Sequence, residues 1–252
     1  MFINETHSTS TLLRQQYSDE LPHLYAIRTD FQTAGRGQTG NGWESEKGKN
    51  LLVSVLLKYP EIAASEQWRL SMLVAVTLYE AIAQFVPKQM LTIKWPNDIY
   101  YGEKKMAGIL LENFLQGAYI QYSIAGVGVN VNQTEWVSDA PNPLSMRLIT
   151  GEEYDVEKLM HAWMEQMVVW QEHTTQDLRN AYMQRLYRKD GWYYYVEREV
   201  DVSPTNIAKM DVDNAFLAQI VDITPQGELQ LRMQNDEIKT YHFKQIRFVL
   251  SK

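Results

Sequence analysis

A glycine-rich segment that carries one arginine is the first place where the sequence points to chemistry. Residues 35–43 read GRGQTGNGW. Glycines let backbone N–H groups approach an anion closely, and the guanidinium of Arg36 fits a carboxylate or a phosphate in two contacts. The indole of Trp43 offers a flat apolar face for a ring. A purely structural loop is the alternative interpretation, but a loop of this length without a function is uncommon.

The run at 35–40 also fits G-x-G-x-x-G, the dinucleotide-binding fingerprint, but its context does not. That fingerprint needs a helix that begins inside the motif and an acidic residue about 20 positions further on. Here the motif leads to Trp43, a charged turn and a strand that begins at Leu51. The sequence also lacks a P-loop motif, an H-E-x-x-H pattern, a G-x-S-x-G elbow and any Cys. Thiol chemistry and P-loop binding are therefore excluded, and a tight zinc site or a hydrolase elbow has no support.

Two lysines and an aspartate lie close together in a segment that is otherwise apolar. The motif KWPND at 94–98 is followed by Lys104 and Lys105. Pro96 keeps Trp95 out of the helical region, so we expect a strand that ends at Lys94 and another that starts at Lys105. This hairpin-like arrangement brings Lys94, Asp98 and Lys105 toward one spot, although surface ion pairing is the alternative.

Two further segments could contact a ligand. Glycines 126 and 128 alternate in a run that reads as a strand, which indicates a ligand or another backbone pressed against it, and Asn130 follows with a free amide. Ser8, Thr9 and Ser10 precede an apolar pair, so these hydroxyls either cap a helix or face a ligand. Close packing of a neighbouring helix would explain the glycines equally well.

The hydrophobic patterns predict the elements that must position these residues. Residues 65–85 fit a buried helix capped by Ser65 and stopped by Pro87. Asp155 precedes a second helix with a packing stripe of Val156, Leu159, Met160, Trp163, Met164, Met167 and Val168. Strands are predicted at 23–28, 51–58, 91–95, 105–114 and 119–131. After Gly191, short β-type runs at 195–202, 215–223, 228–233, 238–243 and 246–250 predict a small barrel or sandwich.

The composition limits the function further. The 252 residues carry a net charge of −7, which is wrong for a protein that holds nucleic acid by its overall field. The window 28–58 nevertheless has a net charge of +2, so a basic loop lies within an acidic chain. The first ten residues do not resemble a secretory signal, and the apolar runs fall far short of the roughly 18 residues of a membrane helix. We therefore expect a cytoplasmic protein that does not bind membranes.

Taken together, GRGQTGNGW at 35–43, KWPND at 94–98, KMAGILLE at 105–112 and GVGVN at 126–130 resemble the biotin–protein ligases in type and order. With the Ser-Thr pair at 8–9 and the terminal β segment, the resemblance covers essentially the whole chain. It implies an α+β fold: a mixed sheet with helices at 1–191, of the biotin/lipoate ligase type, and an SH3-like β domain at 192–252. It also implies that biotin and ATP form biotinyl-5′-AMP and pyrophosphate, and that biotin then passes to a lysine of a biotin carboxyl carrier protein, as in acetyl-CoA carboxylase.

The resemblance also assigns residues. Arg36 and Lys105 would neutralise the reacting anions, Asp98 would orient or deprotonate the incoming lysine, and Lys94 completes the predicted catalytic set. Biotin would lie near Ser8, Thr9, Ser10, Gln32, Gly35, Arg36, Gly37, Gln38, Lys105, Gly126 and Gly128. The nucleotide would lie near Trp43, Asn97 and Asn130. No metal ligand from the protein is predicted, and Mg²⁺ is expected to enter with ATP.

This chain departs from the commonest family pattern, G-R-G-R-x-G-R-x-W, at two charges. Gln38 and Asn41 stand where that pattern has arginines, and Ser10 stands where it has Asn. Because the Ser-Thr pair begins at residue 8, no DNA-binding segment is expected before it, and a monomer or weak homodimer is expected. A lipoate or octanoate ligase of the same fold and a non-catalytic nucleotide-binding module remain as alternatives.

Overall fold

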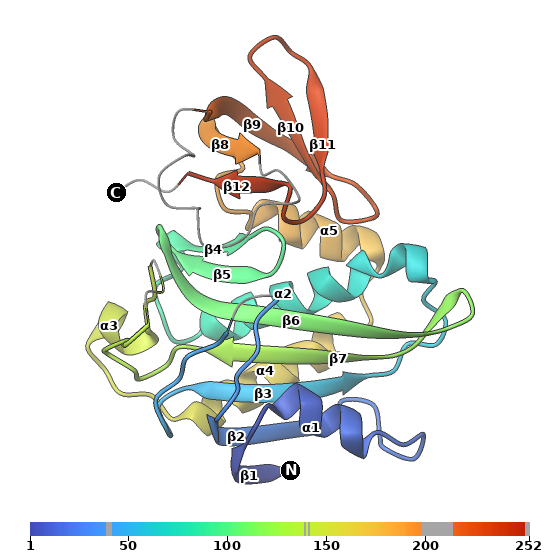
Figure 1. Ribbon diagram of the computed structural model, residues 1–252, viewed down its shortest axis with the longest axis vertical. Helices are drawn as coiled ribbons and strands as arrows, with labels where there is room; N and C mark the ends of the chain where they lie inside the picture. The colour runs from blue at the N-terminus through green and yellow to red at the C-terminus, as the bar shows by residue number, and fades with distance from the viewer. Residues whose placement is uncertain (39–41, 139, 141, 198–213, 250–252) are drawn as a thin grey trace.

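A seven-stranded mixed sheet forms the centre of the larger part of the molecule. The computed structural model describes residues 1–38, 42–138, 140, 142–197 and 214–249. The strands of this sheet are β1 (Phe2–Thr6), β2 (Ala26–Gln32), β3 (Leu51–Leu57), β4 (Leu91–Lys94), β5 (Asp98–Tyr101), β6 (Lys104–Gln116) and β7 (Tyr119–Val129). Their order is β1-β2-β3-β7-β6-β5-β4, with β1 parallel to β2 and every other pair antiparallel (Figure 1). The predicted mixed α+β fold is therefore confirmed.

Helices cover both faces of this sheet, and the apolar strand β3 shows why. All seven residues of β3 are buried, and their side chains alternate between the two faces of the sheet. Leu51, Val53, Val55 and Leu57 join the larger core with α2 (Trp68–Ile82), α4 (Val156–Trp170) and α5 (Thr175–Gln184). Leu56 instead packs in the smaller core of α1 (Thr9–Gln16), on the opposite face. The sheet thus has a helical face and a second face that α1 covers only in part (Figure 1).

The predicted helices are present, with corrections at their ends. Asp155 caps α4, because its carboxylate accepts the backbone N–H of Glu157 at 2.8 Å. Ser65 does not cap α2; it lies in a 3-10 turn, and α2 begins at Trp68 after Gln67. Val168 was predicted to pack, but it is 53% exposed because it falls beyond the edge of the buried stripe.

Among the α-helices and β-strands, four were not predicted, and the predicted strands of the larger sheet all have shifted bounds. The unpredicted elements are β1, β5, α3 (Met146–Thr150) and α5. The strand expected at 23–28 is β2, which begins and ends later, and the strand expected to reach Val131 ends at Val129. β5 is only four residues long, and α5 has a polar sequence, so neither has the periodicity that marks longer elements.

A five-stranded antiparallel sheet forms the C-terminal part, as the short β-type runs predicted. Its strands are β8 (Tyr193–Glu197), β9 (Phe216–Ile223), β10 (Leu229–Met233), β11 (Ile238–Tyr241) and β12 (Ile246–Phe248), in the order β11-β10-β9-β8-β12. The size and strand pattern fit the expected SH3-like domain. The predicted first run begins within β8, but its residues after Glu197 lie outside the described residues.

The two sheets are held together by side chains that cross between them. The indole N–H of Trp95 donates to the carbonyl of Gly227 at 2.9 Å. Arg188, which is nearly buried, donates to the carbonyl of Val249 at 2.7 Å and to Glu103 at 2.7 Å. β12 consequently lies beside the end of the larger sheet where β4 and β5 are found (Figure 1). Among the helices that the structure describes, none is long and apolar enough to cross a membrane.

Candidate active site

One row of directly paired residues crosses the larger sheet and places the predicted site residues. Lys94 of β4 pairs with Asp98 of β5, Asp98 pairs with Gly108 of β6, and Gly108 pairs with Gly128 of β7. Directly paired residues of antiparallel strands point to the same face of a sheet. These four residues therefore share the face that α1 covers only in part, and two of them leave it bare of side chains.

A cavity of about 270 Å³ lies over this row. Most of the predicted site residues line it: Thr9, Ser10, Gln32, Arg36, Gly37, Gln38, Trp43, Lys94, Asn97, Asp98, Lys105, Gly126 and Gly128. Ser8, Gly35 and Asn130 do not line it, although the hydroxyl of Ser8 is 3.4 Å from that of Ser10. The sequence motifs thus converge on one cavity, and three of the predicted residues lie outside its lining.

The indole of Trp43 explains the glycines of the row. A Cβ at Gly128 would lie 2.4 Å from Cε2 of Trp43, and a Cβ at Gly108 would lie 3.0 Å from its Cζ3. A Cβ at Gly126 would lie 3.2 Å from the hydroxyl oxygen of Ser10. In this structure Trp43 lies against Gly128, and Ser10 of the neighbouring helix α1 lies against Gly126, as the packing alternative expected, while both glycines still line the cavity.

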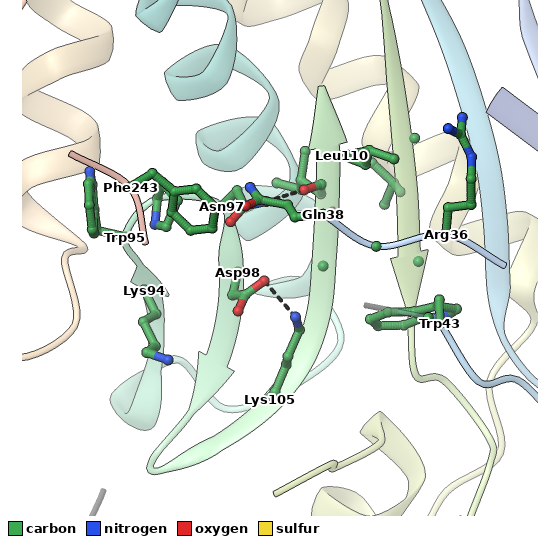
Figure 2. A pocket seen from close by; sticks show the side chains of 18 of the residues that line it. Arg36, Gln38, Trp43, Lys94, Trp95, Asn97, Asp98, Lys105, Leu110 and Phe243 are labelled. Atoms are coloured by element: carbon green, nitrogen blue, oxygen red, sulfur yellow. Dashed lines mark hydrogen bonds and ion pairs between the residues drawn. The ribbon is translucent and has the colours of Figure 1, made fainter. Parts of the chain in front are cut away.

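A short ion pair occupies the centre of the cavity. Nζ of Lys105 lies 2.7 Å from Oδ1 of Asp98, and Figure 2 shows the two side chains pointing toward each other from β6 and β5. The predicted meeting of Lys94, Asp98 and Lys105 is confirmed to the extent that all three line this cavity. Asn97 stays beside the pair because its amide donates to the carbonyl of Ile109.

Arg36 directs its charge elsewhere in this structure. Its Nη2 lies 2.9 Å from Oε2 of Glu112, and Figure 2 shows the side chain pointing away from the Asp98–Lys105 pair. Glu112 belongs to the KMAGILLE motif but was not expected in the site. The arginine of the glycine-rich loop is therefore neutralised by a carboxylate unless a ligand competes for it.

The ammonium of Lys94 has a strongly lowered pKa. Burial lowers the pKa of its ammonium from 10.5 to about 8, and the charge of Asp98 offsets only part of that effect. The ammonium donates to the hydroxyl of Tyr100 at 3.0 Å. It also lies 4.5 Å from the ring centre of Tyr100 and 5.3 Å from that of Phe248 on β12.

The opposite end of the cavity is lined by hydroxyl and amide groups. Thr9 donates its backbone N–H to Oε1 of Gln32 at 2.8 Å, and its hydroxyl lies 2.8 Å from that of Ser54. Ser8 is the N-cap residue of α1, but its side chain makes no cap hydrogen bond. The predicted N-cap position is therefore confirmed without a side-chain cap, and Thr9 and Ser10 form a wall of the cavity.

Three buried polar atoms near the cavity have no hydrogen-bond partner within the part of the chain that the structure describes. They are Oε1 of Gln38, Nε1 of Trp43 and Oδ1 of Asn130. A buried polar group without a partner costs free energy, so each is a candidate for a ligand contact. Asn130 otherwise uses its amide on the carbonyl of Leu144 at 3.4 Å.

The second sheet supplies a wall that sequence reasoning missed. Phe243, Lys244, Ile246, Arg247 and Phe248 all line the cavity beside Lys94 and Trp95. No short-range pattern in these residues signals a site, since they come more than 100 positions after the other motifs. Trp95 of the KWPND motif contacts this part of the chain, because its indole N–H donates to the carbonyl of Gly227, but the motif alone does not predict that contact.

No metal cage is present in the described ranges, where no three His, Cys, Asp or Glu side chains come together. Asp98 is the one carboxylate among the cavity's lining residues in those ranges, and Lys105 already neutralises it. The lining includes five basic residues, so the cavity suits an anion. Any metal ion would have to be bound mainly by that anion.

Comparison with known proteins shows the family of the chain and the likeness of its fold. Residues 2–130 match the Biotin/lipoate A/B protein ligase family. The chain belongs to this family. It is 33% identical over 153 residues to the bifunctional ligase/repressor BirA of Bacillus subtilis, a match that covers 59% of this chain and 46% of that protein. It therefore spans about half the length of that relative.

Two other matches cover a larger share of the similar protein. The chain is 31% identical over 166 residues to the biotin–[acetyl-CoA-carboxylase] ligase of Paracoccus denitrificans, covering 62% of this chain and 68% of that one. The fold resembles a biotin protein ligase from Aquifex aeolicus in complex with biotin and ATP, with a TM-score of 0.74, 21% identity and coverage of 100% and 98%. The second sheet lies within this shared fold, because the likeness extends over the whole chain.

Proposed function

We propose that the chain is an ATP-dependent biotin–protein ligase. The observation that carries the proposal is the single cavity that joins a hydroxyl-lined end, at Thr9 and Ser10, to a cationic end, at Lys94, through the Asp98–Lys105 pair. Its relatives are named as biotin ligases, and the similar Aquifex aeolicus structure holds biotin and ATP. A carboxylate, a polyphosphate and an amine can be brought together in such a cavity.

In the first step, a carboxylate oxygen of biotin attacks the α-phosphorus of ATP. A carbon-bound oxygen joins phosphorus, the bond from that phosphorus to the bridging oxygen breaks, and pyrophosphate leaves with the electron pair. Lys105 would neutralise the two anions that meet, as would Arg36 once a ligand draws it from Glu112. Backbone N–H groups near Gly37 can add donors, and Mg²⁺ would arrive bound to the phosphates of ATP.

In the second step, a lysine amine of the acceptor attacks the acyl carbon, and AMP leaves with the electron pair of the broken bond. The amine must lose a proton before or during attack, and Asp98 is positioned to orient it or accept that proton. Asp98 can do so only after it releases Lys105, which lies 2.7 Å away. An arriving ammonium would compete for the same carboxylate, so the acceptor itself can break the pair.

The biotin ring would lie at the α1 end of the cavity. Thr9, Ser10 and Gln32 supply acceptors and donors there, and Gly126 lines the same part of the cavity without a side chain. The nucleotide would lie between Trp43 and Asn97, where an indole face and an amide are available. Asn130 is 3% exposed and does not line the cavity, so it would contact the nucleotide only after the cavity opens toward it.

We assign residues 1–191 to the catalytic unit and residues 192–252 to the appended β domain, which supplies part of the cavity's wall. The acceptor would be a biotin carboxyl carrier domain, as in acetyl-CoA carboxylase, the partner named for the Paracoccus denitrificans relative. No role in DNA binding is proposed. The net charge of −7 supports this reading.

The direct test is incubation with biotin, Mg-ATP and a biotin carboxyl carrier domain, followed by intact-mass measurement of the carrier. We expect one biotin per carrier, together with release of pyrophosphate. A parallel reaction with lipoate or octanoate and a lipoyl carrier tests the alternative ligase, and ATP turnover without either acid tests a nucleotide-binding module. Arg36→Ala and Lys105→Ala should slow adenylate formation, whereas Lys104→Ala, on an exposed neighbouring residue, should not.

A further inference from the structure

Lys94 stands out when it is compared with Arg36 and Lys105, two other basic residues that line the cavity. Arg36 is paired with Glu112, and Lys105 is paired with Asp98. Within the described ranges, no carboxylate oxygen lies within salt-bridge distance of the Lys94 ammonium, whose hydrogen-bond partner is the Tyr100 hydroxyl. A buried cation without a carboxylate partner is costly, so its presence in a cavity calls for an explanation.

We propose that Lys94 binds the pyrophosphate that leaves in the adenylation step, and that the β- and γ-phosphates of ATP lie against it beforehand. This inference rests on the proposed function, since it requires biotin at the α1 end of the cavity. It assigns a place to the leaving group that no motif specified.

The direction of the reaction places the leaving group at this end. Displacement at phosphorus is in line, so the entering carboxylate and the departing pyrophosphate lie on opposite sides of the α-phosphorus. The row from Gly128 through Gly108 and Asp98 to Lys94 runs directly across the sheet, away from the strands that carry Gln32 and Ser54. With biotin beside β2 and β7 and the α-phosphate near Lys105, the pyrophosphate must extend toward β5 and β4. Figure 2 shows Lys94 beyond Asp98, on the opposite side of the view from Trp43 and Arg36.

The surroundings of Lys94 suit a polyanion that binds and departs. Phe248 on β12 and Tyr100 on β5 exclude water from the ammonium, which strengthens its attraction for an arriving phosphate. Lys244 and Arg247 line the same end of the cavity. Mg²⁺ that accompanies the phosphates would offset part of their negative charge, and so weaken their attraction to these basic groups and let the product leave.

The same burial predicts a proton change on binding. The pKa of Lys94 is lowered to about 8, so the ammonium loses its proton as the pH rises through that value in the free protein. A bound polyanion favours the charged form and raises this pKa. Binding of pyrophosphate near pH 8 is therefore expected to take up a proton, which calorimetry in buffers of different ionisation enthalpy can detect.

The experiment is biotin-dependent exchange of labelled pyrophosphate into ATP, measured with the full chain as wild type, Lys94→Met and Lys104→Met. Methionine matches the stem of lysine as far as Cε without the charge, and Lys104 is exposed and one position from Lys105. We expect Lys94→Met to raise the half-saturating pyrophosphate concentration about tenfold or more, the worth of one charge-assisted hydrogen bond. Affinity for biotin and the melting temperature should not fall, and Lys104→Met should behave as wild type.

A pH series provides a second readout. Between about pH 7 and about pH 9, the half-saturating pyrophosphate concentration of the wild type should approach that of Lys94→Met. Lys94 becomes neutral over this range, whereas the ionisation of pyrophosphate affects both proteins alike. A change of less than about twofold in Lys94→Met, or an equal loss of biotin affinity, would overturn the assignment of Lys94. Absence of biotin-dependent exchange in the wild type would overturn the proposed function as well, so the two failures can be told apart.

Discussion

Replacement of Gly128 by alanine should weaken the nucleotide site and leave the biotin site largely intact. A Cβ at this position would lie 2.4 Å from Cε2, 2.7 Å from Nε1 and 2.8 Å from Cζ2 of Trp43. Carbon atoms in contact are separated by about 3.5–4.0 Å, so the indole must move outward by roughly 1 Å or more. Trp43 belongs to the glycine-rich loop, and its displacement moves the face against which an adenine would stack.

The expected size follows from the packing. Overfilling a well-packed space costs about 1–3 kcal/mol. If ATP binding requires the seated indole, this cost appears in the affinity for ATP as a loss of about fivefold to about 150-fold. The melting temperature should change little, because Trp43 is only partly buried in the free protein.

The matched control is Gly126→Ala, two positions earlier on the same face of β7. Its Cβ would lie 3.2 Å from the hydroxyl oxygen of Ser10, a contact that a small rotation relieves. We expect this variant to affect biotin more than ATP. The assay is titration of each ligand followed by tryptophan fluorescence, with exchange of pyrophosphate as the kinetic readout. If Gly128→Ala lowers biotin and ATP affinity equally, or neither, the assignment of Trp43 to the nucleotide is refuted.

Three further predictions use single contacts. Glu112→Gln should free Arg36 from its 2.9 Å ion pair and lower the KM for biotin or ATP; an unchanged or higher KM for both would show that Glu112 positions the arginine instead. Gln38→Arg should slow escape of the adenylate, measured as a lower rate of biotin labelling of unrelated proteins, because it adds a charge to the loop. Thr77→Val should lower the free energy of unfolding by about 1–3 kcal/mol in denaturant titrations, because the buried indole N–H of Trp163 loses its 3.1 Å acceptor, and a loss below about 0.5 kcal/mol would contradict this.

The positions of the predicted residues in the sheet explain why so much of the site could be inferred from sequence. Lys94 ends one strand and Asp98 begins the next, so a proline-containing turn suffices to set them opposite each other. Gly108 and Gly128 face each other because β6 and β7 form one hairpin around Gly117. Local signals of this kind specify register, and register specifies which side chains share a face.

The contacts that sequence reasoning missed come from elements far apart in the chain. Glu112 reaches Arg36 across the sheet, and Phe248 reaches Lys94 from the second sheet. Neither has a local pattern, since packing between elements is decided by the whole fold. Gly128 is a second example. The alternating glycines predict that something packs against the strand, but only the fold shows that it is Trp43.

The distribution of charge in the cavity connects the sequence departures with the inference about Lys94. In this chain the loop keeps one arginine, Arg36, and a carboxylate holds it. Lys105 and Lys94 stand instead on paired strands of the larger sheet, which hold their backbones in place. A charge on a sheet is already positioned before the ligand arrives, whereas a charge on a loop must be ordered by it at a cost in entropy. We therefore expect Lys94→Met to lower the affinity for pyrophosphate more than Arg36→Ala does. The reverse order would show that the loop, rather than the sheet, provides the main phosphate contact.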